Sequence, residues 1–256
     1  ADQATISVDG ATSGGLLRIG GDFQGGDTGL READSLLVEQ GASLSANSEL
    51  GDAGTVIAWA NGDTIFRGDV SAVARGAVGN GGLIEVSGKQ YLYFDGSVMA
   101  NSLNGESGTV LFDPGNVIIG ATGTGVPPLV SPVSFSTISI ASINQTLQAG
   151  ANVLVVTESG SILVNDVGGG GDDINSAAAN NRDSSIQWTN SLSSFGAFAS
   201  GSIIVNTHIR TSGAGSINLL AGWTGSEGDI ALSFDPQSAW DFYVGNGGFG
   251  KSGGTV

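Results

Sequence analysis

The chain has no cysteine, and only eight Lys and Arg residues stand against 24 Asp and Glu residues. Without cysteine, no disulfide, thiolate metal site or cysteine nucleophile can form. The formal net charge of −16 repels nucleic-acid phosphates and anionic lipid headgroups, so we expect neither as a partner. No run of about 18 apolar residues is present, so we expect no membrane insertion. The first residues lack a basic region followed by an apolar run. We therefore expect an internal or mature fragment, with any export signal upstream.

Glycine is abundant, at 44 of 256 residues, while charged residues make up only 12%. That composition is far from that of an average globular enzyme. Glycine-rich chains are often disordered, but 40% of this chain is hydrophobic and lies in short runs, which disordered chains lack. We therefore expect a folded chain with glycine at its turns.

An internal repeat is the strongest pattern in the sequence. Three similar segments begin at Gly54, Gly82 and Gly108, at spacings of 28 and 26 residues. Phe66 and Phe94, in the runs that follow the first two segments, also lie 28 residues apart. Each unit contains three short strands separated by Gly, Asn or Asp. Three such strands and their corners have the length of one turn of a three-sided coil.

The repeat predicts an all-β fold, a right-handed parallel β-helix (three-sided solenoid) with short loop insertions. We divide it into a repeat block over 1–120 with coils of about 27 residues, a Pro/Gly-rich junction or loop over 121–136, and further coils over 137–256 with an insertion near 168–182. Alternation predicts that Val56, Ala58, Ile84, Val86, Val110 and Phe112 point inward and that Thr55, Trp59, Glu85, Ser87 and Asp113 point outward. Strands are also expected at 5–8, 16–19, 35–38, 136–140, 152–156, 161–164, 185–188, 202–205, 216–220 and 229–232, and short helices at 141–149 and 174–182.

Several segments resemble the large exoproteins of the filamentous-haemagglutinin family, which are exported by two-partner secretion and act largely as adhesins. They are residues 17–22, 54–59, 81–89, 108–114, 150–157, 160–164 and 202–206, and Glu85-Val-Ser-Gly-Lys89 is the most specific of them. The resemblance covers about residues 5–235 and implies a secreted rod on a bacterial cell surface. It also implies an outer-membrane secretion partner during export, and polysaccharide, a host or neighbour cell-surface receptor, or another copy as binding partners. The Pro-rich stretch at 127–132 and the segment 168–181 depart from the family pattern.

The tripeptide Arg67-Gly68-Asp69 matches the sequence that integrins read from an exposed loop tip, and it is a candidate receptor-binding site. The alternative is a structural corner, because it lies at the repeat position of Asp95-Gly96, where a turn needs glycine and a polar neighbour.

Aromatic residues are the candidate carbohydrate-binding positions, because flat rings suit the apolar faces of sugars. We expect exposed platforms at Trp59, Tyr91, Tyr93, Trp188 and Trp223, with Trp240 and Tyr243 as further members. The alternative is that these rings stack as a structural ladder.

Calcium is the one metal that the sequence raises, through the acidic, glycine-rich pieces Gly21-Asp22, Gly26-Asp27 and 168–173. The regular Gly-Gly-x-Gly-x-Asp array of calcium-binding β-rolls is absent. We therefore predict ordinary polar turns, no metal site and no cofactor.

Catalysis is not expected from this sequence. Glu85, Asp95, Asp113 and Asp69 are candidate carboxylates, but none has a recognisable partner, and the single His208 has no nucleophile-elbow context. The preferred prediction is an extracellular adhesin segment without catalysis, whose open coil ends allow end-to-end self-association. Two alternatives stay open: a carbohydrate-binding segment of a biofilm matrix adhesin, and a β-helical polysaccharide lyase or hydrolase.

Overall fold

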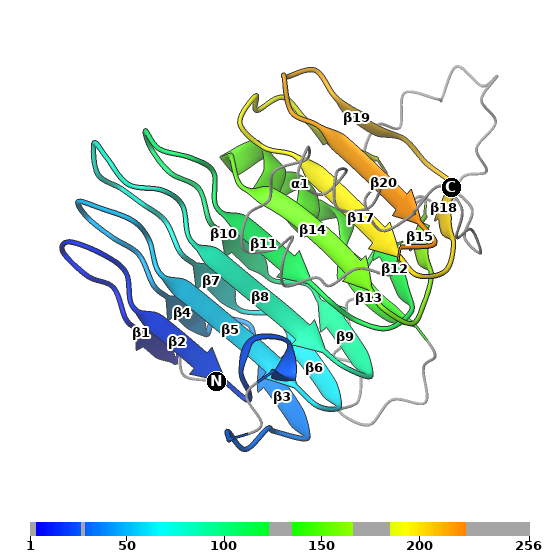
Figure 1. The fold of residues 1–256 in the computed structure, drawn as a ribbon, viewed down its shortest axis with the longest axis horizontal. Helices are drawn as coiled ribbons and strands as arrows, with labels where there is room; N and C mark the ends of the chain where they lie inside the picture. Colours follow the sequence, from blue (N-terminus) through cyan, green and yellow to red (C-terminus); the bar gives the residue numbers. More distant parts are fainter. Residues whose placement is uncertain (1–3, 27–28, 123–134, 166–184, 224–256) are drawn as a thin grey trace.

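The computed structural model describes residues 4–26, 29–122, 135–165 and 185–223, which form an all-β fold of parallel sheets with one α-helix (Figure 1). Within each row the strands follow one another from the N-terminal end to the C-terminal end of the described chain, with one exchange in the second sheet. Of the predicted junction over 121–136, residues 123–134 lie outside the described residues, and Ser136 already begins β13. The predicted helix at 174–182, the insertion near 168–182 and the strand at 229–232 also lie outside them.

Two sheets of seven strands and a shorter third row make up the stack. The first sheet contains β2 (Leu16–Ile19), β5 (Thr55–Ala60), β8 (Leu83–Gly88), β11 (Thr109–Phe112), β14 (Asn152–Thr157), β17 (Phe195–Ala199) and β20 (Ile217–Ala221). The second contains β3 (Ser35–Val38), β6 (Asp63–Phe66), β9 (Tyr91–Phe94), β13 (Ser136–Ser139), β12 (Val117–Gly120), β15 (Ile162–Val164) and β18 (Ile203–Val205). The third row has β1 (Thr5–Ser7), β4 (Ser43–Ser45), β7 (Asp69–Ser71) and β10 (Ser97–Met99), then α1 (Ile140–Ala149), then β16 (Ile186–Trp188) and β19 (Ile209–Thr211).

The predicted repeat register is confirmed by the strand pairing. Thr55 pairs with Leu83, and Leu83 with Thr109, so the residues that follow the three repeat glycines lie one above another. The glycines themselves are required by close backbone contact. A Cβ atom on Gly82 would lie 2.1 Å from the Gly54 carbonyl oxygen, and one on Gly108 would lie 2.2 Å from the Gly82 oxygen.

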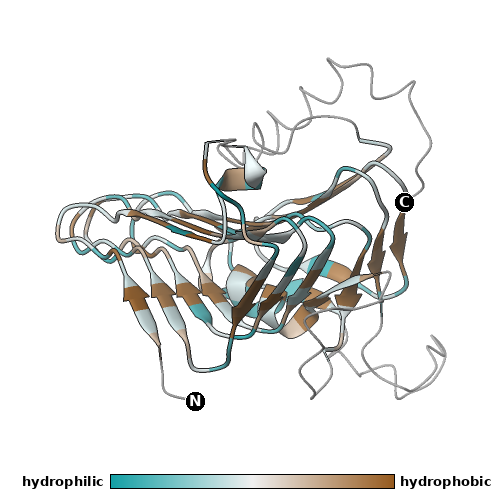
Figure 2. Ribbon diagram, turned by 90° about the horizontal axis from the view of Figure 1, so that it is seen from below, coloured by the Kyte–Doolittle hydropathy of each residue, from teal (hydrophilic) through white to brown (hydrophobic). Residues whose placement is uncertain are grey.

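The main core lies between the rows and contains every residue that was predicted to point inward. All three rows contribute to it, with Val56 from the first sheet, Phe94 from the second and Val98 from the third. Phe94 stacks on its register partner Phe66 in the second sheet, with ring centroids 5.4 Å apart, and it meets Phe112 of the first sheet at 4.7 Å. Figure 2 shows apolar residues along the strands and more polar ones at many of the turns.

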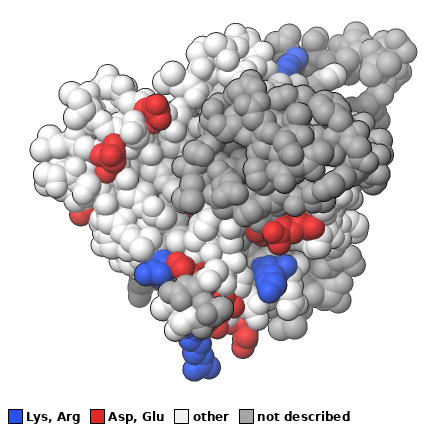
Figure 3. Space-filling model, in the orientation of Figure 1, with Lys and Arg blue, Asp and Glu red and all other residues white. Residues whose placement is uncertain are grey.

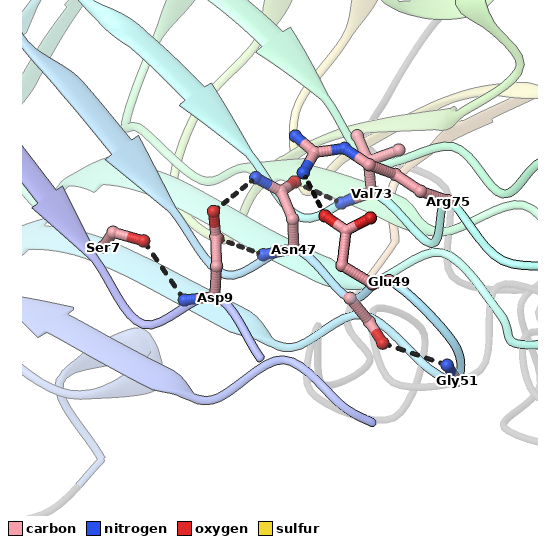
Figure 4. Close-up of polar contacts among 8 residues, drawn as sticks. Ser7, Asp9, Asn47, Glu49, Gly51, Val73 and Arg75 are labelled. Carbon is pink, nitrogen blue, oxygen red and sulfur yellow. Dashed lines mark hydrogen bonds and ion pairs between the residues drawn. The ribbon is translucent and has the colours of Figure 1, made fainter. Parts of the chain in front are cut away.

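A buried asparagine ties together three successive turns of the third row (Figure 4). Asn47 donates from its backbone N–H to Asp9 Oδ1 (2.6 Å) and from Nδ2 to Asp9 Oδ2 (3.3 Å), while its Oδ1 accepts from the Val73 N–H (2.8 Å). Burial raises the pKa of Asp9, but hydrogen bonds from Asn47, Ser45 and Ser7 outweigh it and leave the pKa lowered. The loops between the strands are therefore held in register as well as the strands.

One departure from a simple coil is the order of β12 and β13. The second sheet runs β9, β13, β12, β15, so β13 lies between β9 and a strand that precedes it in the chain. The chain thus leaves one strand position next to β9 empty when it forms β12, and β13 then occupies that position. Neither the return nor β12 itself was predicted, and β4, β17 and β19 were also missed.

The other departure is α1, which replaces a strand between β10 and β16. A short helix was expected at 141–149, and that expectation is confirmed. The Ser139 hydroxyl caps the N-terminus by accepting from the Ser142 N–H, and Gly150, at φ +96°, ends the helix in the left-handed conformation.

Polar side chains of α1 satisfy the strand edges that the helix leaves without a partner. On one side the hydroxyls of Ser142 and Thr146 donate to the carbonyls of Gly96 (2.6 Å) and Val98 (3.0 Å). On the other side Asn144 accepts from the Gln187 N–H (2.8 Å) and donates to the Ser185 carbonyl (2.9 Å). Residues four apart share a helix face, so Ser142 and Thr146 serve one neighbouring edge while Asn144 serves the other.

We predict that Asn144→Ala lowers the free energy of unfolding by about 1–3 kcal/mol, because it removes two partly buried hydrogen bonds, to the Ser185 carbonyl and from the Gln187 N–H. Urea denaturation followed by circular dichroism measures the change. The matched control is Gln145→Ala, which alters the next, exposed residue of the same helix. Equal stability of the two variants would show that water replaces Asn144 at no cost.

Candidate binding surfaces

The five aromatic residues predicted as exposed platforms are all buried, which corrects that expectation. The exposed fractions are 4% for Trp59, 5% for Tyr91, 6% for Tyr93, 3% for Trp188 and 1% for Trp223. None of these rings offers a free face to a sugar in this structure. Trp240 and Tyr243 lie outside the described residues.

Trp59 was correctly placed on the outer side of the first sheet, but the turn around η1 (Phe23–Gly25) covers it. A Cβ atom on Gly21 would lie 2.6 Å from Trp59 Cε3, and one on Gly25 would lie 2.6 Å from Cζ2. Gly25 also has φ +63°, which favours glycine. The two glycines therefore let the turn lie flat on the indole.

The other four aromatic residues are buried for separate reasons. Trp188 joins the main core and donates from Nε1 to the Ser193 carbonyl (3.1 Å). Trp223 packs against Phe198, with ring centroids 5.7 Å apart. Tyr91 and Tyr93 form a small cluster with Ile65.

A second apolar cluster lies apart from the main core and is drawn from alternate positions of the first sheet. Its members are Leu111, Leu154, Val156, Phe198, Leu220 and Trp223, with Phe23 and Leu83 packed against them. The first sheet therefore buries side chains on both of its faces, which a period-two pattern cannot predict.

The same sheet carries two carboxylates whose environment opposes ionisation. Burial raises the pKa of Glu85 from 4.5 to about 8; Asp113 and Asp22 add to the increase, while hydrogen bonds from Gln24 and Ser87 oppose it. The Gln24 N–H lies 3.1 and 3.3 Å from the two Glu85 oxygens. Burial, followed by the charge of Glu158, also raises the pKa of Asp113. Glu85 has no exposed surface, so a polymer substrate cannot reach it in this structure.

Arg67-Gly68-Asp69 forms a corner of the stack and not a projecting tip. The Arg67 N–H donates to the Val38 carbonyl and the Asp69 N–H to the Ala42 carbonyl. Gly68 is buried, and a Cβ atom there would lie 2.6 Å from the Ala42 oxygen. The glycine therefore serves the turn, while Asp69 is exposed at the start of β7.

The remaining candidates do not assemble into one site. Within the described chain, no three Asp, Glu or His side chains come together as a metal site would need. Asp22 pairs with Arg18 at 2.9 Å, Asp95 accepts from the Thr122 hydroxyl, and His208 is exposed just before β19. Asp27 and 168–173 lie outside the described residues. No described helix has the length and apolarity to cross a membrane.

A polar groove between α1, β16 and β19 was not predicted. It has a volume of about 540 Å³ and is lined by Gln148, Gln187, Trp188, Thr189, Arg210 and the two residues after it. Gln187 and Arg210 are paired in register on neighbouring strands, although they lie 23 residues apart in the sequence. No sequence motif predicts that these two residues are neighbours, and strand β19 itself was not predicted.

Charged groups are sparse on the face of the molecule drawn in Figure 3, where most of the described surface is neither acidic nor basic. The basic residues visible there are separated, and they form no broad patch on the described part of that face.

Comparison with known proteins identifies no family, because no family model matches the chain and no curated protein matches it significantly.

Proposed function

We propose that this chain is a right-handed, three-sided parallel β-helix and serves as a stiff segment of an extracellular adhesin of the filamentous-haemagglutinin type. The observation that carries the proposal is the pair of seven-stranded parallel sheets, which the chain visits in turn except at the consecutive strands β12 and β13. Residues from all three rows meet in one core. Such repetition stabilises a chain without cysteine through its core and hydrogen-bond ladder.

Attachment, and not catalysis, is the activity that this architecture supports best. The carboxylate with the most strongly raised pKa, Glu85, is closed off, whereas the sides of the stack present exposed side chains on successive turns. β1, β2 and β3 each stand at the end of their sheet's strand order. Their outer edges offer backbone groups to a further coil of the parent protein or to a second copy.

The proposal is tested by adhesion of coated beads. We expect beads that carry the folded chain to be retained several-fold better than albumin-coated beads on bacterial cells and on immobilised polysaccharide. The control is Val110→Asp, which puts an unpaired charge into the core and unfolds the chain; it should lose the retention.

Retention of the folded chain at the albumin level on every surface would remove the adhesive role. The β-helix itself is tested separately by a crystal structure of the purified chain, which should show a right-handed coil of three rows. A left-handed coil, or rows that do not follow one another along the chain, would contradict it.

A further inference from the structure

Arg210 is held in the groove by a neutral group. Its Nε and Nη2 atoms donate to Gln187 Oε1 at 3.2 and 2.7 Å. An amide oxygen fixes the direction of the guanidinium without cancelling its charge. The opposite edge of the guanidinium carries one N–H on Nη1 and one on Nη2. These two parallel donors match the two oxygens of a carboxylate.

None of the described residues that line the groove is acidic, although the chain contains 24 Asp and Glu residues. The two ion pairs found among the described residues are Arg18 with Asp22 and Arg75 with Glu49, so Arg210 belongs to neither. Arg210 is thus oriented, and no described acidic residue pairs with it, which favours an anionic ligand from outside.

The other lining groups suit a hydroxylated ligand. Gln148 is locked to Thr189, because its Oε1 accepts from the Thr189 N–H (3.0 Å) and its Nε2 lies 3.1 Å from the Thr189 hydroxyl. Ser212 is exposed beside Arg210. The volume of about 540 Å³ is within the range of small-ligand sites. Amides and hydroxyls on fixed elements are the groups that bind sugar hydroxyls.

We propose that this groove binds a uronic acid residue of an acidic polysaccharide, with the sugar carboxylate on Arg210 and the sugar hydroxyls on Gln148, Thr189 and Ser212. The inference deepens the adhesive function proposed above and rests on it. It assigns recognition to a charged hydrogen-bond site and not to the aromatic platforms that the sequence suggested.

Titration calorimetry with a tri-uronate tests the proposal, with a neutral trisaccharide and a sulfated trisaccharide as comparison ligands. We expect the tri-uronate to bind at least about tenfold more tightly than the neutral sugar, because a charge-assisted, two-point contact is lost in the latter. Weaker binding of the sulfated sugar would support a planar carboxylate as the recognised group. Sulfated sugar as the tighter ligand would overturn that assignment.

Two variants should abolish the preference for uronate. Arg210→Gln removes the charge, and Gln187→Glu keeps the shape of the groove but neutralises Arg210 with an adjacent carboxylate. The matched control is Arg75→Gln, which also removes the charge of an exposed arginine, but from the ion pair with Glu49 outside the groove. Thermal unfolding of each variant checks that the fold is retained.

Undiminished tri-uronate binding by Arg210→Gln and Gln187→Glu, or no binding by the native chain, would overturn the inference. The bead experiment separates this failure from a failure of the adhesive function. Beads retained on cells equally well with Arg210→Gln would leave adhesion standing and refute this groove as its site.

Discussion

Replacing Phe94 with alanine is expected to lower the free energy of unfolding by about 3–5 kcal/mol. Phe94 is fully buried and lies between Phe66 and Phe112, so the truncation opens a cavity that touches three successive turns. The neighbouring rings cannot move in to fill it, because their strands are fixed by the ladder on both sides. Urea denaturation, with the ring environment followed by near-ultraviolet circular dichroism, measures the effect.

The control for Phe94 is Leu103→Ala, which removes a side chain that is 67% exposed. It should change stability by no more than about 0.5 kcal/mol. Phe94→Leu, which fills part of the cavity, should fall between the two. A loss below about 1 kcal/mol in Phe94→Ala would contradict the close packing of the three rings.

Glu85→Gln is expected to stabilise the protein at pH 8 and to remove much of the pH dependence of its stability. The folded pKa of Glu85 is raised to about 8, above the ordinary value of 4.5. The stability associated with its protonated form is therefore fully present below about pH 4.5 and is lost as the pH rises through about 8. The slope is roughly 1.4 kcal/mol per pH unit in that window.

Glutamine reproduces the protonated carboxyl, since its oxygen can still accept from the Gln24 N–H that binds Glu85. The gain at pH 8 should be on the order of 4 kcal/mol, and it should vanish near pH 4. Part of the slope should remain, because Asp113 has a raised pKa with the same sign. The control is Glu39→Gln, at an exposed position. Urea midpoints from pH 4 to 9 that do not change for the native protein would refute the assignment.

Repetition made the central part of the fold predictable from the sequence. The glycines at 54, 82 and 108 mark places where backbones touch, so their spacing gave the strand register directly. Alternation after each glycine separated the residues of the main core from the others. Both signals report contacts between equivalent positions of neighbouring turns.

Contacts outside the repeat were not predictable in the same way. The pattern placed Trp59 and Glu85 on the outer side of the sheet but contained no information on the turn that covers them. It also could not find the groove, because Gln187 and Arg210 become neighbours only through a strand pairing that spans 23 residues. The outward direction of a side chain was taken to mean exposure, and the predicted exposure of the aromatic rings was therefore wrong.

The exchanged order of β12 and β13 has a consequence for how the chain assembles. If the stack grows from its N-terminal end, each completed strand is the template for the next one. β12 follows β11 in the chain but has no pairing with β9; its partners are β13 and β15, which both come later. Residues 117–120 must therefore wait as an unpaired strand until residues 136–139 fill the rung between them and the completed turns. On this route, propagation of folding would pause at that point until β13 pairs with β9.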